Sequence, residues 1–304
     1  MKLIYLAWWF VRARFFGRKR PLQSVIFITE ACNLKCRHCA LAQNGIATSK
    51  HKSFEQIREE MEYSYNLGSR FIDFEGGEPT LWRGTDPETG ATMDVNDLIV
   101  YAEKMGFFSC TITTNAQMPF KGSKANSIWV SMDGIGAAHD DIRGEGAFAK
   151  LEKNIAESGH PAVSVNMAIN NRNYESVEEA INYVKQNPHI KLISFSFHTP
   201  YQGTEHLFLP WDKRCEVIDL IIRMKKEGAP VMNSVSGLKL MKDNKFRKEC
   251  WVSNFILADG TRLSECTGKT AGVCDQCGFG MAGEMRSVFD FKLDTLRAGM
   301  SLRM

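Results

Sequence analysis

The sequence lacks an apolar run long enough to cross a membrane as a helix. Its best candidate, residues 3–11, has nine residues, against the roughly 20 that a spanning helix needs. No cleavable signal peptide, internal repeat or low-complexity segment is visible. The chain has 304 residues, of which 44% are apolar. These features predict one barrel-sized cytoplasmic domain with a small appendage.

The sequence also has little net charge, +3 in total, and most of its excess is local. Six basic residues and no acid lie within residues 1–20, which leaves a formal charge of −3 elsewhere. This distribution gives no reason to expect a nucleic acid partner. Residues 1–22 are predicted to be an amphipathic, basic segment with an aromatic helix over 2–16. That helix would either make peripheral contact with an anionic membrane surface or plug the bottom of a barrel.

Apolar runs alternate with helical patterns through most of the chain, which predicts parallel βαβ units and a partial (β/α)6 TIM-like barrel. A core barrel is expected over residues 23–235 and a small Cys-rich extension over 236–304. The expected strands are 24–29, 70–75, 108–114, 127–131, 162–169 and 191–197, and the expected helices are 53–67, 94–105, 148–158, 175–186 and 211–226. Ser53 with Gln56 and Ser176 with Glu179 are predicted capping boxes.

Nine cysteines without a secretion signal favour reduced, metal-binding thiols in a reducing, low-oxygen cytoplasm. Three of them, Cys32, Cys36 and Cys39, follow the first predicted strand with C-x3-C-x2-C spacing. They can bind three irons of a cubane cluster and leave the fourth open, whereas a ferredoxin-type cluster takes four cysteines. The alternatives are a disulfide set or a zinc site, for which His38 lies too close to Cys39 to serve comfortably as a fourth ligand.

The C-x3-C-x2-C loop resembles the signature of radical S-adenosylmethionine (radical SAM) enzymes, and further segments strengthen the resemblance. Gly76-Gly77-Glu78-Pro79 matches the GGEP stretch of that family, and 113–116 resembles its TTNG segment with Ala in place of Gly. Residues 131–134 resemble S-x-D-G, and 139–144 resemble H-D-x-I-R-G. The resemblance implies a [4Fe-4S] cluster on Cys32, Cys36 and Cys39. It also implies SAM contacts from Gly76, Gly77, Glu78, Pro79, Thr114, Asn115, Ser131 and Asp133.

A second cysteine group consists of Cys250, Cys266, Cys274 and Cys277. Asp259-Gly260 predicts a hairpin turn between the first two. Four thiolates suit either a second [4Fe-4S] cluster or a structural zinc ion. The segment resembles the truncated "twitch" form of the SPASM extension, which implies an auxiliary cluster. Cys110, Cys215 and His198 are expected to be packed residues without a catalytic role.

The resemblance therefore implies an enzyme that cleaves SAM reductively and abstracts hydrogen from a small-molecule, lipid or peptide substrate, with a flavodoxin- or ferredoxin-type electron donor. Few residues precede the first strand, so an N-terminal peptide-binding domain is not expected, and peptide modification becomes an alternative. The basic aromatic helix points instead to a lipid or a membrane-adjacent substrate. Two further alternatives are a non-catalytic iron–sulfur electron carrier and a zinc-stabilised binding protein.

Overall fold

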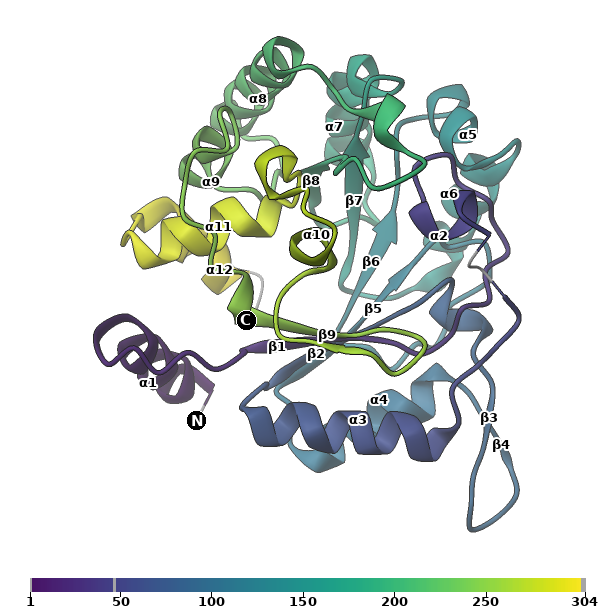
Figure 1. Cartoon of the computed structure of the whole chain (residues 1–304). Helices are drawn as coiled ribbons and strands as arrows, with labels where there is room; N and C mark the ends of the chain where they lie inside the picture. Colours follow the sequence, from purple (N-terminus) through teal and green to yellow (C-terminus); the bar gives the residue numbers. More distant parts are fainter. Residues whose placement is uncertain (1, 46–47, 302–304) are drawn as a thin grey trace.

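The computed structural model describes residues 2–45 and 48–301 and contains one curved sheet with helices on its outer side (Figure 1). The strand order is β10-β9-β1-β2-β5-β6-β7-β8, and the strands from β9 to β8 are parallel to their neighbours. Among the described residues the two edge strands, β10 and β8, do not pair, so the barrel is open. The six predicted strands are confirmed as β1 Gln23–Phe27, β2 Phe71–Glu75, β5 Ser109–Thr114, β6 Ser127–Ser131, β7 Val163–Ile169 and β8 Ile193–Phe197.

The predicted extension joins this sheet directly. Its strand β9 (Ser253–Ile256) pairs in parallel with β1, and β10 (Arg262–Leu263) pairs antiparallel with β9. The predicted hairpin turn is confirmed, since the Leu257 amide donates to the Thr261 carbonyl at 2.9 Å and Gly260 adopts a φ of +88°. A separate two-stranded hairpin, β3 (Gly84–Thr85) with β4 (Thr92–Met93), projects from the barrel.

The five predicted helices are confirmed within a few residues. They are α3 Phe54–Leu67, α4 Val95–Met105, α6 Ala147–Ser158, α7 Val177–Gln186 and α8 Trp211–Lys226. Shorter helices are α2 Ala40–Gln43, α5 Ala137–Arg143, α9 Val235–Leu240, α10 Thr267–Thr270, α11 Gly280–Phe289 and α12 Leu293–Ser301, and the 3-10 turns are η1 Pro79–Leu81, η2 Tyr174–Ser176, η3 Glu205–Leu207, η4 Cys250–Val252 and η5 Cys274–Gln276.

One of the two predicted capping boxes is present. Ser53 and Gln56 exchange hydrogen bonds at the start of α3 as expected. The prediction for Ser176 is wrong, because its side chain makes no cap bond. The 3-10 turn η2 runs directly into α7, and the Ser176 hydroxyl donates instead to the Asn173 carbonyl of that turn at 3.0 Å.

Side chains alternate strictly along the strands, and the two faces differ in polarity. Outward residues such as Ile72, Phe74 and Ile112 are fully buried in one core with the helices. Cys110 belongs to that core, as expected for a packed thiol. The inner positions remain partly exposed and are mostly polar: Phe27, Glu75, Thr111, Thr113, Trp129, Ser131, Asn166 and Ser196. The inside of the barrel therefore presents a polar surface that a ligand can reach.

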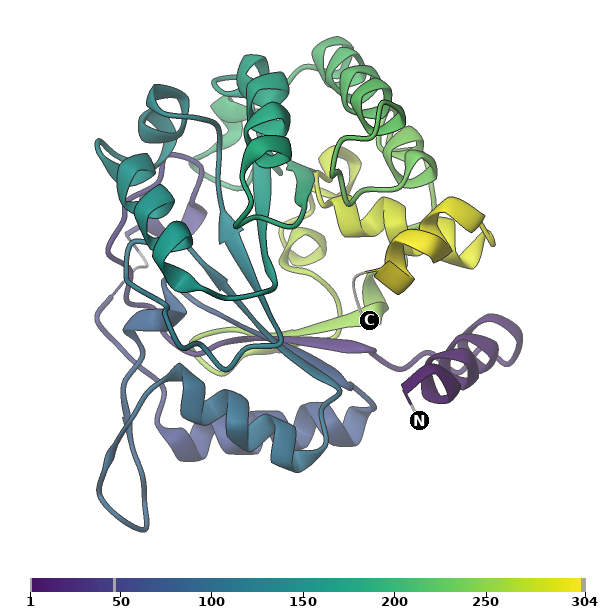
Figure 2. The same cartoon turned by 180° about the vertical axis from the view of Figure 1, so that it is seen from behind.

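Helix α1 (Lys2–Phe15) packs at the opposite end of the sheet, against residues at or just before the starts of β1, β2, β5 and β9. Trp9 and Ala13 are buried in a second apolar cluster with Leu22, Phe71, Val252 and Phe289. Both views place the helix beside the last two helices of the chain (Figures 1 and 2). One face thus packs as a plug would, while its other face exposes an apolar set: Leu3, Ile4, Trp8, Phe15 and Phe16. No helix among the described residues is long and apolar enough to span a membrane.

Candidate active site

The three cysteines of the C-x3-C-x2-C motif lie together on the loop between β1 and α2. All three are free, Cys36 is buried, and the other two are partly exposed. Burial is the main cause that raises the pKa of Cys36, to about 11, and the charges of Cys39 and Cys32 raise it further. The Cys39 amide donates to the Cys36 carbonyl at 3.2 Å, so the loop turns back on itself between these two cysteines. Binding of one cluster by the three thiols stays a prediction.

Polar hydrogens surround these sulfurs. The Leu34 amide donates to Cys32 Sγ at 3.5 Å, and Asn115 Nδ2 approaches the same sulfur at 3.8 Å. Arg143 Nη1 donates to Cys36 Sγ at 3.9 Å. Such donors stabilise thiolate ligands in metal centres. The donor set therefore fits an anionic iron–sulfur cluster held by three thiolates.

The Gly76-Gly77 loop packs on the segment that leads into the cysteine loop. The Gly77 amide donates to the Thr29 carbonyl at 2.9 Å, and the Glu78 amide donates to the Ala31 carbonyl at 2.8 Å. A Cβ on Gly76 would lie 2.4 Å from the Thr29 carbonyl oxygen, and one on Gly77 would lie 2.3 Å from that of Ala31. Both positions therefore require glycine for contact with the protein itself.

The buried Glu78 side chain links the loop that follows β2 to the loop that follows β5. Its carboxylate accepts hydrogen bonds from the Thr114 hydroxyl at 2.6 Å, the Thr80 hydroxyl at 2.6 Å and the Asn115 amide at 2.7 Å. Burial raises its pKa, and the hydrogen bonds from these donors counteract part of that effect. Glu78 thereby positions Asn115 beside Cys32. A contact of either residue with SAM stays a prediction.

Asp133, at the end of β6, forms a buried ion pair with Arg143 of α5. Arg143 Nε lies 2.7 Å from Asp133 Oδ2, and the Ala168 amide donates to Asp133 Oδ1 at 2.9 Å. Burial is the largest effect on Asp133 and opposes its ionisation, but Arg143, the two neighbouring histidines and the Ala168 amide together outweigh it, so the pKa is lowered. The same guanidinium also reaches Cys36. The predicted ligand role of Asp133 stays a prediction, as does that of Ser131, which is partly exposed on the inner face.

Two residues beside the thiols were not assigned from the sequence. The only sequence feature that pointed to Arg143 was its place in the segment that resembles H-D-x-I-R-G. His38 lies between two cysteines, and its Nδ1 is 3.6 Å from Asp133 Oδ2. Burial lowers the pKa of His38 to about 4, so the ring is neutral at ordinary pH. A cavity of about 700 Å³ opens between this loop and α5.

The four cysteines of the second group also come together. Cys250 lies in η4, Cys266 precedes α10, and Cys274 and Cys277 flank η5. The mutual influence of the Cys250 and Cys266 thiols raises the pKa of Cys250 and lowers that of Cys266 to about 6. No three His, Cys, Asp or Glu side chains in the described part of the chain meet as ligands of one metal ion. In an iron–sulfur cluster each thiolate binds a separate iron, whereas in a zinc site all ligands bind one ion. The observation therefore concerns sites for a single metal ion and does not test a cluster.

The second group is seated on the end of β8. The Phe197 amide donates to the Gly278 carbonyl at 2.7 Å, and a Cβ on Gly278 would lie 1.7 Å from the Phe197 carbonyl oxygen. The buried Arg214 of α8 donates to the Cys277 carbonyl at 3.0 Å, while its Nε and Nη1 have no partner among the described residues. The three-cysteine loop thus follows the C-terminal end of β1, where chemistry is located in α/β barrels. In the second group, Cys277 lies beside the end of β8, whereas Cys250 directly precedes β9.

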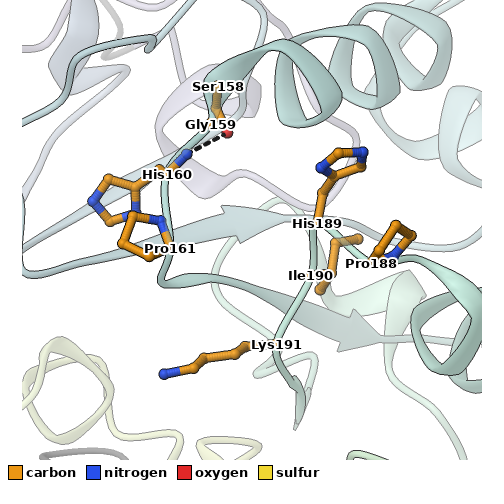
Figure 3. Close-up of a pocket in the computed structure, with 8 residues that line it drawn as sticks. All are labelled: Ser158, Gly159, His160, Pro161, Pro188, His189, Ile190 and Lys191. Carbon is orange, nitrogen blue, oxygen red and sulfur yellow. Dashed lines mark hydrogen bonds between the residues drawn. The ribbon is translucent and has the colours of Figure 1, made fainter.

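A further cavity, of about 220 Å³, lies at the other end of the barrel (Figure 3). Residues 158–161 and 188–191 line it, just before β7 and β8 begin. His160 and His189 do not contact each other there (Figure 3). Since the three-cysteine loop leaves the opposite strand ends, this cavity is not part of the candidate active site.

Comparison with known proteins agrees with this geometry. The chain is 26% identical over 244 residues to the Fe-coproporphyrin III synthase of Methanosarcina barkeri, a match that covers 71% of this chain and 58% of that protein. It is 24% identical over 171 residues to the mycofactocin maturase MftC of Mycolicibacterium smegmatis, which covers 54% and 41%. The chain thus spans about half the length of these curated relatives.

Solved structures share the fold. The structure of Streptococcus suis SuiB bound to its precursor peptide SuiA superposes with a TM-score of 0.62 at 18% identity, over 83% of this chain and 61% of that one. The family model of the radical SAM superfamily matches residues 26–184, more than half of the sequence. That range holds the three-cysteine loop and the GGEP loop. The chain belongs to the radical SAM superfamily.

Proposed function

We propose that this protein cleaves SAM reductively and abstracts hydrogen from its substrate. Cys32, Cys36 and Cys39 would hold a [4Fe-4S] cluster. When bound, it supplies one electron, taken from a flavodoxin- or ferredoxin-type donor, that splits SAM into methionine and a 5′-deoxyadenosyl radical, which takes a hydrogen atom from the substrate. The observation that carries this proposal is the presence of three free thiols on one loop at the C-terminal end of a parallel strand, with hydrogen-bond donors to two of their sulfurs.

The residues around the thiols would position SAM rather than react with it. The GGEP loop lies beside the cysteine loop, which supports the proposal that backbone groups of 76–79 other than the amides of Gly77 and Glu78 would bind the methionine part of SAM. Thr114, Asn115, Ser131 and Asp133 follow the next two strands and would complete the site. Of these, Ser131 is the better candidate for direct contact, because hydrogen bonds within the protein already engage the side chains of Thr114, Asn115 and Asp133.

A second [4Fe-4S] cluster on Cys250, Cys266, Cys274 and Cys277 is the favoured occupant of the C-terminal group, with zinc as the alternative. Its support is Arg214, which is fully buried beside Cys277 without a carboxylate partner among the described residues. A buried cation needs a compensating charge. Four metal-bound thiolates would provide it.

Three substrate classes stay open, and the similarity to Fe-coproporphyrin III synthase favours a small molecule. The precursor peptide bound by SuiB and the maturase MftC favour a ribosomal peptide. A lipid or membrane-adjacent substrate is favoured by the exposed apolar face of α1, next to Arg12 and Arg14. Aromatic and basic residues together suit an interface with anionic lipid.

Anaerobic reconstitution tests the chemistry. We expect about eight irons per chain and formation of 5′-deoxyadenosine on reduction with SAM, measured by mass spectrometry. Replacing Cys32, Cys36 and Cys39 by Ala should abolish the product while iron at the second group remains. Iron without SAM cleavage in the wild type would make the protein an electron carrier, and bound zinc without iron would make it a zinc-stabilised binding protein.

Membrane contact is tested by two neighbouring tryptophans. Trp8 is 56% exposed and Trp9 is 8% exposed. Trp8→Ala should weaken binding to vesicles that contain anionic lipid and leave thermal stability nearly unchanged. Trp9→Ala should cost about 3–5 kcal/mol of folding free energy. Equal sedimentation of wild type and Trp8→Ala with vesicles would reject membrane contact through this face.

A further inference from the structure

Two carboxylates of β2 point into the barrel without a basic partner. Asp73 and Glu75 occupy alternate positions of the strand, so both lie on its inner face, while Ile72 and Phe74 face the core. Asp73 is 7% exposed and Glu75 is partly exposed. Thr113 Oγ1 donates to Asp73 Oδ2 at 3.0 Å. Asp73 Oδ1 is buried and has no hydrogen-bond partner of normal geometry among the described residues, although the side chains of Thr111, Thr113 and Glu75 each lower the pKa of Asp73.

This arrangement is costly for the isolated protein. A buried carboxylate without a cation loses its hydration and gains no compensating charge. Burial accordingly raises the pKa of both groups, of Asp73 to about 6 and of Glu75 to about 8, and the two negative charges oppose each other. Fold stability alone gives no reason for this pair, since polar but uncharged side chains fill the neighbouring inner positions, such as Thr111 and Thr113.

The neighbours of the pair suit an organic cation. Strand register places Phe27 of β1 opposite Glu75, and it places Trp129 of β6 opposite Thr113, on the far side of β5 from β2. Both aromatic side chains are partly exposed. Carboxylates provide charge and hydrogen-bond acceptors, and aromatic faces attract ammonium and guanidinium groups. The inner positions of β1, β2, β5, β6, β7 and β8 in the described sheet include no Lys, Arg or His that would compete for the pair.

We propose that Asp73 and Glu75 form a substrate subsite inside the barrel that binds an ammonium or guanidinium group. The inference rests on the proposed function and adds the chemical class of its substrate: a molecule with an amine or guanidine at the end that enters the barrel. A peptide with a lysine, arginine or free amino terminus near the reacting carbon meets this description. A neutral lipid does not.

The test compares methylguanidinium with N-methylurea, a neutral molecule of nearly the same shape. Binding to the full-length reconstituted protein is measured by saturation-transfer NMR at several concentrations, at pH 6 and pH 8. We expect saturable binding of methylguanidinium only, and tighter binding at pH 8 because the pair is then more fully ionised. Asp73→Asn/Glu75→Gln should weaken it at least tenfold. The matched control, Glu178→Gln/Glu179→Gln on the exposed first turn of α7, removes the same charge and should bind as the wild type does.

The outcomes separate this subsite from the proposed function. Equal binding of both probes to the wild type, or unchanged binding of methylguanidinium to the Asp73/Glu75 variant, overturns the subsite. The single variant Glu75→Gln, checked by circular dichroism, provides the same comparison if the double variant does not fold. SAM cleavage by the wild type is measured separately. If the probe binds but SAM is not cleaved, the proposed function is rejected and the subsite is kept. If SAM is cleaved but the probe does not bind, only the subsite is rejected.

Discussion

Replacement of Asp133 by Asn should destabilise the protein strongly, because it leaves a buried guanidinium without its countercharge. Asp133 is fully buried and Arg143 is 8% exposed, with 2.7 Å between Oδ2 and Nε. The new amide can still accept the hydrogen bond from the Ala168 amide. It cannot neutralise Arg143, which lies against Cys36. The perturbation therefore reaches the cysteine loop as well as the fold.

Removal of one partner from a buried ion pair costs about 3–5 kcal/mol. Against a typical total of about 5–15 kcal/mol, this is a large share of the folding free energy. The neighbouring ion pair of Asp141 with Arg172, which is more exposed, shows how much of this cost depends on burial. Its closest distance is 2.6 Å, but its side chains are 32% and 46% exposed. Asp141→Asn should therefore cost less than about 1 kcal/mol.

Urea unfolding of the reduced apoprotein, followed by circular dichroism, measures both free energies. The double variant Asp133→Asn/Arg143→Met should regain much of the loss, because no unpaired charge is left. Since the pKa of Asp133 is lowered in the fold, its contribution is complete above its ordinary value of 3.8 and disappears as the pH falls through the lower, folded value. A cost for Asp133→Asn no greater than that for Asp141→Asn would refute the reasoning.

Three further predictions concern single positions. Gly77→Ala should lower both stability and iron content, because its Cβ would lie 2.3 Å from the Ala31 carbonyl oxygen and displace the cysteine loop. Iron analysis after reconstitution measures the iron content of the variant. A full iron content would contradict the prediction. Ala116→Gly should raise the free energy of unfolding by up to about 1 kcal/mol, because Ala116 has a φ of +56°, a conformation that glycine adopts without strain. Urea titrations measure this change. A loss of stability would contradict the assigned backbone strain. Burial raises the pKa of Glu284 from 4.5 to about 7, so the folded state retains a proton that the unfolded state has lost, and stability should fall as pH rises between these values. Glu284→Gln should reduce that slope by at most about 1.4 kcal/mol per pH unit, and an unchanged slope in urea titrations across this range would count against it.

Much of the fold was predictable because buried parallel strands appear in the sequence as continuous apolar runs between helical patterns. The capping box at Ser53 was predictable because its two residues, Ser53 and Gln56, are only three positions apart in the sequence. Ser176 has the same pattern, but the preceding 3-10 turn decides its hydrogen bond. The pairing of β9 with β1 joins segments about 230 residues apart, and local pattern does not encode such a pairing.

The site divides in a similar way. Spacing identified both cysteine groups, because the ligands of each are close in sequence. It did not identify Arg143, whose contact with Cys36 depends on how α5 turns back toward the loop. The pair of Asp73 and Glu75 was overlooked because a strand with alternating charge resembles a half-exposed strand. Only the burial of both faces reveals that these carboxylates point into the barrel.

The contact of Gly76 and Gly77 with residues 29–31 has a consequence for how the two loops can move. The two loops are interlocked backbone to backbone, so neither can swing outward while the other stays in place. Displacing either loop would break its amide contacts with the other, so the two segments should open as one cooperative unit. Cys32 and Cys39 are already partly exposed, so loading with iron does not depend on that opening.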